Sequence, residues 1–331
     1  MNLQELVDVL RASRGFAHKR DIGDIVGALA QALPGGAQDM KQAVANGDDC
    51  AAIADADGYL LLAIEGMTED FVASMPWFAG YSGVMVNISD IAAMGGRPIA
   101  VVDALWSKGM QPADEVLKGM AAASAAYGVP IVGGHSNKRS ERGQLAVAIL
   151  GRAQKLLSSF NARPGDTLMM AIDLRGAFEE PYPWWNASTR APAARLRGDI
   201  ALLPQLAEQG LCDAAKDISM AGALGTALML LECSQVGAHI DIDAIPRPTG
   251  VPLLRWLTAF PSFGYVFSVR PQHVAAVQAL FDAREIACAA VGEVRSGSQV
   301  SLQQADEQAL LWDFAQDAFI TASKREHAHA S

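Results

Sequence analysis

The segment from residue 86 to 98 limits what this chain can fold into more than any other stretch. Its apolar residues recur at the spacing of one helix face, and Gly95-Gly96 followed by Pro98 ends the helix. Asn87 and Asp90 lie one turn apart, so both side chains share a face. An amide and a carboxylate on an otherwise apolar helix indicate a site for a metal ion or a phosphate. The alternative is that Asp90 is an ordinary solvated helix acid.

The composition restricts the class of partner. The chain has 331 residues, 51% of them hydrophobic, and a length above about 250–300 residues favours two domains. The formal net charge is −10 without any basic block, which argues against nucleic acid or an anionic membrane as a partner. No run of about 18 apolar residues and no signal peptide are apparent, so we expect a soluble cytoplasmic protein. The four cysteines show no CxxC spacing and are expected to be reduced thiols.

Helical and extended patterns alternate along the chain, which predicts an α/β architecture with mixed sheets. Residues 13–20 form a basic stretch, either a solvated connection or a loop that folds over phosphates, and residues 323–331 are expected to be a frayed tail. A domain boundary is expected within 152–166. The expected helices cover residues 2–12, 21–33, 82–94, 113–127, 221–233, 272–283 and 306–320, and the expected strands cover 50–54, 59–64, 99–105, 129–132, 145–150, 167–172, 237–242, 264–269 and 286–291.

Two glycine-containing segments supply further candidate residues. Asp48 and Asp49 lie in a stretch whose composition predicts a turn. Neighbouring carboxylates repel each other unless a cation lies between them. Gly133-Gly134 lets the backbone approach a ligand just before a polar run. That run ends in Lys138-Arg139, the cations that an acidic chain needs to hold a phosphate. The alternative for this second segment is a plain loop between a strand and a helix.

Two further stretches can contribute to a binding site. Ser219 precedes the small-residue helix at 221–233, where it can cap the helix and leave free N–H groups for a phosphate oxygen. The loop at 176–192 contains Trp184-Trp185, which form either a substrate shelf or an anchor to the core; we favour the anchor.

Four motifs occur in the order and spacing of one known superfamily. Together they resemble the aminoimidazole ribonucleotide (AIR) synthetase-like, or PurM-like, superfamily over about residues 45 to 300. Thiamine-monophosphate kinase, selenophosphate synthetase and a hydrogenase maturation enzyme that dehydrates a carboxamide are members. The motifs are Gly47-Asp48-Asp49-Cys50-Ala51, Asn87-Ile88-Ser89-Asp90-Ile91-Ala92-Ala93-Met94-Gly95, Gly133-Gly134-His135 and Asp217-Ile218-Ser219.

The resemblance implies a PurM-like fold of two α/β domains. Residues 1–152 are expected to form an N-terminal domain that binds ATP and metal and dimerises through a shared β-barrel. Residues 153–331 are expected to form the C-terminal domain that closes the cleft. The implied assembly is a homodimer that holds Mg-ATP between its domains, with a contribution from the neighbouring subunit.

The resemblance also assigns roles to residues. Magnesium is expected at Asp49, Asp90 and Asp217; Glu65 is the best match to a strand-end acid, with Asp70 behind it. Carboxylates suit Mg²⁺, which prefers hard oxygen ligands and completes its shell with phosphates and water. His135 and Lys138 are the expected catalytic residues, His135 as an acid or base or a phosphate donor, unless it is merely a loop residue. The expected nucleotide contacts are Gly47, Asp48, Asn87, Gly133, Gly134, Asn137, Arg139 and Ser219.

Two departures from the kinase pattern leave two functions open. His135 and Met220 stand where the kinase carries aspartates, which predicts fewer or weaker magnesium sites. The first function is Mg-ATP-dependent phosphoryl transfer to an oxygen of a small-molecule substrate, as a kinase or to activate a carbonyl or amide. The alternative is a nucleotide-binding dimer with reduced catalysis that serves as a partner or regulatory protein. ATP consumption by the purified protein separates the two.

Overall fold

A computed structural model of the chain describes residues 1–32 and 44–321. These residues form two compact units. Unit 1 comprises the described residues of Met1–Asp48, Leu157–Ala187 and Gly210–Ser331, and unit 2 comprises Asp49–Leu156 and Ser188–Gln209. The division of function between residues 1–152 and 153–331 stays a prediction. Residue 33 of the expected helix 21–33 and the expected tail at 323–331 lie outside the described residues.

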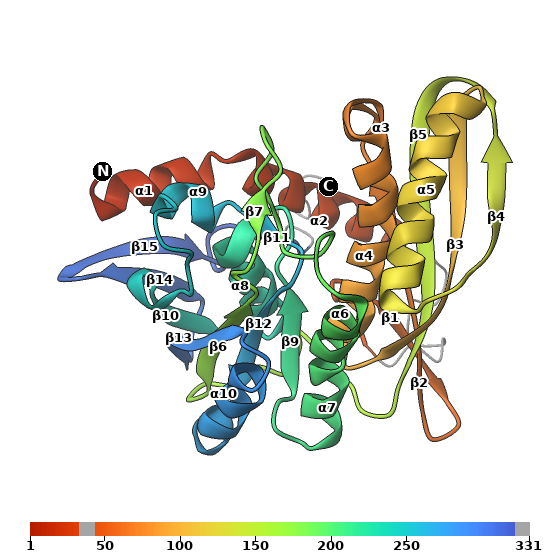
Figure 1. Cartoon of the computed structure of the whole chain (residues 1–331). Coiled ribbons are helices and arrows are strands. Elements are labelled where there is room, and N and C mark those ends of the chain that lie inside the picture. The colour runs from red at the N-terminus through yellow and green to blue at the C-terminus, as the bar shows by residue number, and fades with distance from the viewer. Residues whose placement is uncertain (33–43, 322–331) are drawn as a thin grey trace, which may run out of the picture. The chain divides into compact units, whose positions relative to one another are not determined.

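Unit 2 is built on a five-stranded sheet in the order β1-β2-β5-β3-β4 (Figure 1). β3 and β4 are parallel, and the other neighbouring pairs are antiparallel. Helices cover the face that buries Leu61, Val101 and Val147. The elements of this unit are β1 (Ala51–Asp55), β2 (Gly58–Met67), α3 (Glu69–Ser74), α4 (Pro76–Ala93), β3 (Arg97–Lys108), α5 (Met110–Tyr127), β4 (Ile131–Asn137), β5 (Arg139–Ala153), α6 (Ala193–Ile200) and α7 (Leu202–Glu208).

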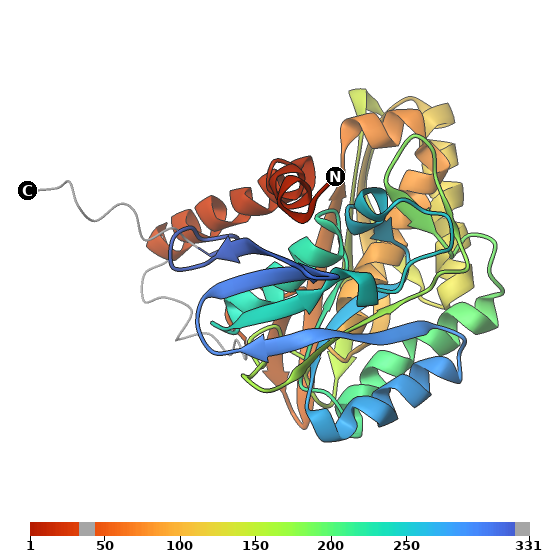
Figure 2. The same cartoon turned by 90° about the vertical axis from the view of Figure 1, so that its left-hand side faces the viewer.

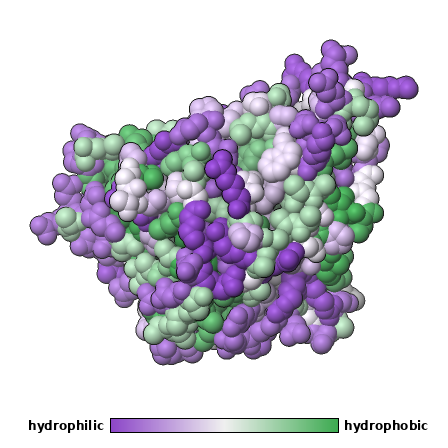
Figure 3. Space-filling model, viewed as in Figure 1, coloured by the Kyte–Doolittle hydropathy of each residue, from purple (hydrophilic) through white to green (hydrophobic). Residues whose placement is uncertain are grey.

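The opposite face of the unit 2 sheet is apolar and exposed. Side chains of β2, β5 and β3 alternate between the two faces, and most of the outward positions are apolar, several of them large aliphatic residues. Figure 3 shows apolar side chains along its right-hand margin, where β3 and β4 lie in Figure 1. We call this surface the outer face; its exposed large apolar residues include Ile53 (39%), Leu62 (50%), Ile64 (69%), Val102 (42%) and Leu150 (38%).

Helix α4 carries the segment that dominates the sequence, and it is the core of unit 2. Every residue from Phe78 to Ala93 is buried. A Cβ added at Gly80 would lie 2.0 Å from the Val116 carbonyl oxygen, so α4 and α5 cross where glycine alone fits. The predicted helix is confirmed and begins earlier than expected. Asp90 is 7% exposed, so the alternative of a solvated helix acid is wrong.

Residues 188–209 pack onto the helical side of unit 2 although they follow it by a long stretch of sequence. The Ser188 Oγ atom is hydrogen-bonded to the hydroxyls of Tyr81 (2.6 Å) and Tyr127 (2.8 Å) on α4 and α5. An ion pair between Arg97 and Glu208 fixes the far end of the segment. Hydroxyls buried in this way lower the folded state's free energy only when they are paired.

Unit 1 is built on a seven-stranded sheet in the order β15-β14-β10-β13-β6-β12-β9, beside a small sheet β11-β8-β7. Its core includes the apolar helix α8 together with β6, β10 and β12. The remaining elements are β6 (Thr167–Ile172), β7 (Ala177–Phe178), β8 (Trp184–Asn186), β9 (Ala214–Asp217), α8 (Gly222–Cys233), β10 (Gly237–Asp241), η2 (Ile242–Ala244), α9 (Leu253–Leu257), β11 (Phe260–Pro261), β12 (Gly264–Val269), η3 (Pro271–His273), α10 (Val274–Asp282), β13 (Ala287–Arg295), β14 (Gln299–Gln304) and β15 (Glu307–Asp313).

The N-terminal helices α1 (Leu3–Arg11) and α2 (Arg14–Ala32) belong to unit 1, and α1 lies beside β15 (Figures 1 and 2). The solvated connection predicted at 13–20 is wrong, because most of this stretch is helix, whereas its predicted phosphate contact stays a prediction. Ser13 Oγ accepts a hydrogen bond from Phe16 N (3.3 Å), as a helix cap does. Phe16 is 1% exposed and packs edge-on against Phe319. Burial of this one aromatic ring outweighs the basic residues around it.

Two other predicted elements differ from the structure. The helix expected at 306–320 is wrong, because Glu307–Asp313 is strand β15, paired antiparallel with β14. A tight turn with Ala305 at φ 46° folds the chain back onto β14, so the apolar residues read as a helix face are strand positions. The loop expected after Gly133 is also wrong, since β4 runs to Asn137 and Lys138 forms the turn into β5.

The two tryptophans of the loop at 176–192 behave differently. Trp185 is 6% exposed, donates from Nε1 to the Asp173 carbonyl oxygen (2.9 Å), and packs edge-on against Trp256. It is therefore an anchor, which is the interpretation that we favour from the sequence. Trp184 is only half-buried and stacks on Tyr182 with ring centroids 4.1 Å apart.

Candidate functional site

Asp90 is positioned by α4 and by its neighbour Asn87. The Asn87 Nδ2 group donates to the carbonyl oxygens of Gly83 (2.7 Å) and Val147 (2.9 Å), which fastens α4 to β5 one turn before Asp90. Asn87 is fully buried, and among the described residues its Oδ1 atom has no hydrogen-bond partner. The amide thus links the helix to the sheet, and its Oδ1 atom is left as a buried acceptor.

Asp48 and Asp49 are adjacent but have different surroundings. The Asp48 carboxylate accepts hydrogen bonds from Ser158 and Ser159 within unit 1. Asp49 is half-buried and is the first residue of unit 2. Gly47, just before them, has φ 124°, and its carbonyl oxygen accepts from the Cys233 thiol at 3.7 Å. The nucleotide role predicted for Gly47 and Asp48 stays a prediction.

Asp217 is the last residue of β9 and is 5% exposed. It lies opposite Tyr265 of β12, and the chain continues in register as Ile218 N donates to the Gly264 carbonyl oxygen (2.8 Å). Ser219 follows in the turn that leads to α8. The N-cap residue of α8 is Ala221, so the prediction that Ser219 caps this helix is wrong. Its Oγ atom is buried and has no hydrogen-bond partner among the described residues.

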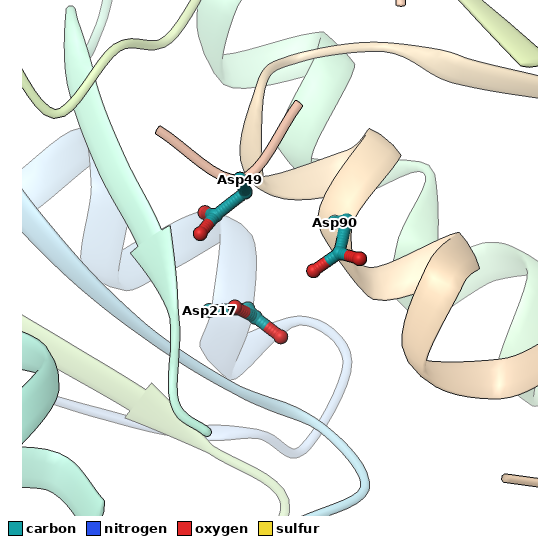
Figure 4. A group of neighbouring side chains, drawn as sticks. All are labelled: Asp49, Asp90 and Asp217. Carbon is teal, nitrogen blue, oxygen red and sulfur yellow. The ribbon is translucent and has the colours of Figure 1, made fainter. Parts of the chain in front are cut away.

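Three carboxylates from distant parts of the sequence converge. One ligand atom from each of Asp49, Asp90 and Asp217 lies within 4.8 Å of the other two (Figure 4). Two of the three side chains are buried, where mutual repulsion between ionised carboxylates is weakly screened. A divalent cation with oxygen ligands relieves that repulsion, and three carboxylates within this span are a donor set that suits Mg²⁺. Their role as metal ligands stays a prediction.

Glu65 and Asp70 lie outside this carboxylate group. Glu65 is on β2 opposite Val147 of β5, and its side chain is half-buried on the helix-covered side of the sheet. Asp70 is in the first turn of α3. Among the described residues, the compact group of possible metal-ligating side chains consists of Asp49, Asp90 and Asp217.

The Gly-Gly-His segment lies on a different part of unit 2 from Asp90. His135 is opposite Ala104 in register, with its ring 6.0 Å from the Trp106 ring, so it points to the outer face. Asn137 Oδ1 accepts from Arg139 N (2.9 Å) and shapes the exposed turn that contains Lys138.

This turn is distant from Asp90 along β5. Gly151 lies against Ile91 of α4, next to Asp90. Arg139 is about 12 residues earlier on the same strand, roughly 40 Å at about 3.3 Å per residue. The structure therefore brings Asp49, Asp90 and Asp217 together and leaves His135, Lys138 and Arg139 apart from Asp90 within unit 2.

Two features near the acidic motifs carry no signal in the sequence. The pair Ser158-Ser159, which binds Asp48, lies in a stretch that reads only as a boundary. Lys216 precedes Asp217 and is 4% exposed, an unusual burial for lysine. In β9 it faces the side of the sheet with Val266, opposite to Asp217. No spacing in the sequence signals either one.

Two family models match most of the chain, and two relatives match nearly all of it. The model of the AIR synthase related protein N-terminal domain matches residues 47–153, and that of the C-terminal domain matches residues 167–304. An uncharacterized protein of Synechocystis is 48% identical over 316 residues, 95% of this chain and 97% of the relative. An uncharacterized protein of Methanocaldococcus jannaschii is 34% identical over 321 residues, which cover 96% of this chain and 98% of the relative. The thiamine-monophosphate kinase of Pyrococcus horikoshii is 28% identical over 287 residues, which cover 79% of this chain and 86% of the kinase.

Solved structures share the fold at low sequence identity. T. maritima PurL complexed with ATP has a TM-score of 0.70 at 18% identity, over 90% of this chain and 52% of that chain. AaThiL complexed with AMPPCP and TMP has a TM-score of 0.63 at 20% identity, over 79% and 89%. These likenesses confirm the predicted PurM-like α/β fold with mixed sheets. The chain, as its four motifs indicate and its family matches show, belongs to the AIR synthase related proteins.

Proposed function

We propose that this protein uses Mg-ATP to transfer a phosphoryl group to an oxygen of a small-molecule substrate. The observation that carries the proposal is the convergence of the Asp49, Asp90 and Asp217 carboxylates within 4.8 Å. A thiamine-monophosphate kinase among the relatives, and a PurL structure with ATP, support the same kind of chemistry. The transfer is either the final reaction or the activation of a carbonyl or amide for a second step.

The proposed roles follow from the chemistry of the donors. Asp49, Asp90 and Asp217 hold the cation, which when bound neutralises charge on the phosphates. Ser219 offers a buried hydroxyl without a partner among the described residues, suited to a phosphate oxygen. Little covalent chemistry by the protein is required, because phosphoryl transfer depends mainly on positioning and charge neutralisation.

We further propose that the active form is a homodimer. The outer face exposes Leu62, Ile64 and Val102 on adjacent strands, and contiguous apolar surface of this kind marks an interaction site. His135 lies on that face, and Lys138 and Arg139 lie at the far end of β5 from Asp90. Their proposed catalytic and phosphate contacts are therefore assigned to the second copy in the dimer.

The test uses binding and turnover in parallel. Binding of Mn²⁺ with AMPPCP is followed by electron paramagnetic resonance, and phosphoryl transfer by incubating γ-³²P-ATP with a small-molecule cell extract and separating the labelled products. Asp90→Asn and Asp217→Asn are expected to lose about a hundredfold or more in both, because each removes a carboxylate ligand of the cation. Asp103→Asn, the same change in unit 2 outside the carboxylate group, is the control and should retain both.

The two outcomes that fail the proposal differ in meaning. Wild-type protein that binds no Mn²⁺ with AMPPCP refutes the metal site itself. Tight binding without any labelled product favours the alternative, a nucleotide-binding partner or regulatory protein. That alternative is favoured by one observation: Met220, 43% exposed, stands beside Ser219 where the kinase pattern has an acid.

A further inference from the structure

The Asp48 carboxylate is held by a pair of serines from a distant part of unit 1. Its Oδ2 atom accepts from Ser158 Oγ (2.8 Å) and from Ser159 N (3.0 Å), and its Oδ1 atom accepts from Ser159 Oγ (2.7 Å). Both carboxylate oxygens are thus engaged by the protein, and hydrogen bonds to an ionised carboxylate are the strong kind. We call this arrangement of Asp48, Ser158 and Ser159 the serine clasp.

The serines that form the clasp are themselves fixed. Ser158 is 3% exposed and Ser159 is fully buried. Ser158 N donates to the Asp213 carbonyl oxygen (2.9 Å), and Ser234 Oγ donates to the Ser159 carbonyl oxygen (2.6 Å). Donors that cannot move impose one position on the carboxylate that they bind.

Holding Asp48 restricts the residue that follows it. Consecutive Cα atoms are about 3.8 Å apart across a planar peptide bond, so the held Asp48 limits where the backbone of Asp49 can lie. Gly47, on the other side of Asp48, also packs closely. A Cβ atom added to Gly47 would lie 3.4 Å from the Cys233 sulfur. The chain enters unit 2 at Asp49 directly from this held segment.

We infer that Asp48 is a positioning residue whose serine clasp orients Asp49 toward the cation, and that Asp48 does not itself contact the nucleotide. The inference rests on the proposed metal role of Asp49. The two acids of the Gly-Asp-Asp motif then have different roles, since the first binds the protein and the second binds the ion. A preorganised ligand loses less conformational freedom on binding, so the clasp raises the affinity of the site for the cation.

The test compares Mn²⁺ affinities in the absence and presence of AMPPCP, measured by electron paramagnetic resonance on the full chain. Ser159→Ala removes one hydrogen bond to Asp48 and is expected to weaken Mn²⁺ binding about tenfold, the usual effect of losing an outer-shell partner. Ser159→Thr keeps the hydroxyl and should restore the wild-type value. Ser298→Ala is the matched control, because Ser298 Oγ donates to the Asp313 carboxylate at 2.7 Å in the same unit; its Mn²⁺ affinity should not change.

Each result decides the matter. Tight Mn²⁺ binding by the wild type with an equal affinity in Ser159→Ala overturns the clasp and leaves the metal site standing. Failure of the wild type to bind Mn²⁺ overturns the metal site and the clasp together. A loss in Ser159→Ala that is matched in Ser298→Ala shows a general loss of packing and also overturns the inference. Thermal melts identify a variant that fails to fold, in which case Ser158→Ala replaces it, with the same expectation.

Discussion

Gly133 and Gly134 look equivalent in the sequence, but their environments differ. Asp103 of β3 lies beside Gly134 of β4, and a Cβ at Gly134 would lie 2.5 Å from the Asp103 Oδ2 atom and 2.7 Å from its carbonyl oxygen. Among the described residues, no atom lies within 4 Å of the corresponding position at Gly133. Gly134 is thus required by packing, whereas Gly133 has open space in which a ligand can approach the backbone.

Substituting the two glycines separates these roles. Gly134→Ala should lower the free energy of unfolding by about 1–3 kcal/mol, because the backbone oxygen of Asp103 cannot yield as a flexible side chain would. Gly133→Ala should stay within about 0.5 kcal/mol of the wild type. Urea denaturation followed by circular dichroism measures both. Equal stability of the two variants would contradict the packing role of Gly134.

Asp103 gives a pH dependence with a definite sign. Burial raises the pKa of Asp103 above its usual range, so the folded state binds this proton more tightly than the unfolded chain. Its contribution to stability is present at low pH, below the unfolded pKa of about 3.9, and is lost as the pH rises through the folded pKa. At pH 7 the ionised side chain therefore destabilises the fold.

Asp103→Asn is expected to melt at a higher temperature than the wild type at pH 7. The difference should shrink as the pH is lowered through the folded pKa of Asp103, since the wild-type side chain becomes neutral there. Differential scanning calorimetry between pH 3.5 and 7 follows the change. A difference in melting temperature that does not vary with pH would show that the effect has another origin.

At the scale of elements, hydrophobic periodicity predicted what is buried on one continuous face. The helices at 82–94, 113–127 and 221–233 were recoverable in this way, because each is long and apolar. The strand at residues 307–313 was not recoverable in this way. Its direction is set by a turn with positive φ at Ala305, and alanine is not a residue that indicates such a turn. The helix at residues 14–20 was not predicted because the stretch is basic in composition. Burial of Phe16 outweighs that composition in the folded protein.

The segment at residues 319–321 is held by a buried side chain that periodicity does not reveal. Glu232, in the last turn of α8, is 7% exposed. Its carboxylate accepts from Phe319 N (2.8 Å), Ile320 N (2.7 Å), Thr321 N (3.2 Å) and Thr321 Oγ1 (2.9 Å). These backbone donors have a buried acceptor only because α8 supplies it.

Glu232→Gln should release this segment. The amide nitrogen places a donor against donors, so we expect a loss of about 2–4 kcal/mol in the free energy of unfolding and faster hydrogen exchange at residues 319–321. Glu141→Gln is the control, because its exposed ion pair with Lys108 contributes less than about 1 kcal/mol. Urea denaturation and hydrogen-exchange mass spectrometry report the two quantities. Similar values in both variants would refute the fastening role.

At the scale of the whole molecule, the motifs predicted the family and the fold, and they also named the three aspartates that converge. Motif spacing can do this because one fold fixes where each motif lies. It could not find Ser158 and Ser159, which are brought to Asp48 from about 110 residues away by tertiary structure alone. Nor could it show that His135 points to the outer face, because a one-residue change of strand register reverses the face.

The exposed apolar outer face predicts that the protein assembles as a dimer. If two copies join through this face, as we propose, the wild-type protein should sediment as a dimer, and Ile64→Glu should sediment as a monomer, because a buried unpaired carboxylate opposes association. Ile25→Glu is the matched control: Ile25 is 64% exposed, close to the 69% of Ile64, and lies on α2 of unit 1.

Analytical ultracentrifugation of the three proteins at equal concentration provides the measurement. Labelled-product formation should fall with the dimer in Ile64→Glu and persist in Ile25→Glu, because the proposed contacts of Lys138 and Arg139 come from the second copy. A wild-type monomer would refute the dimer. A monomeric Ile64→Glu that remains fully active would instead show that one copy holds a complete site, which would move the phosphate contacts away from the turn after β4.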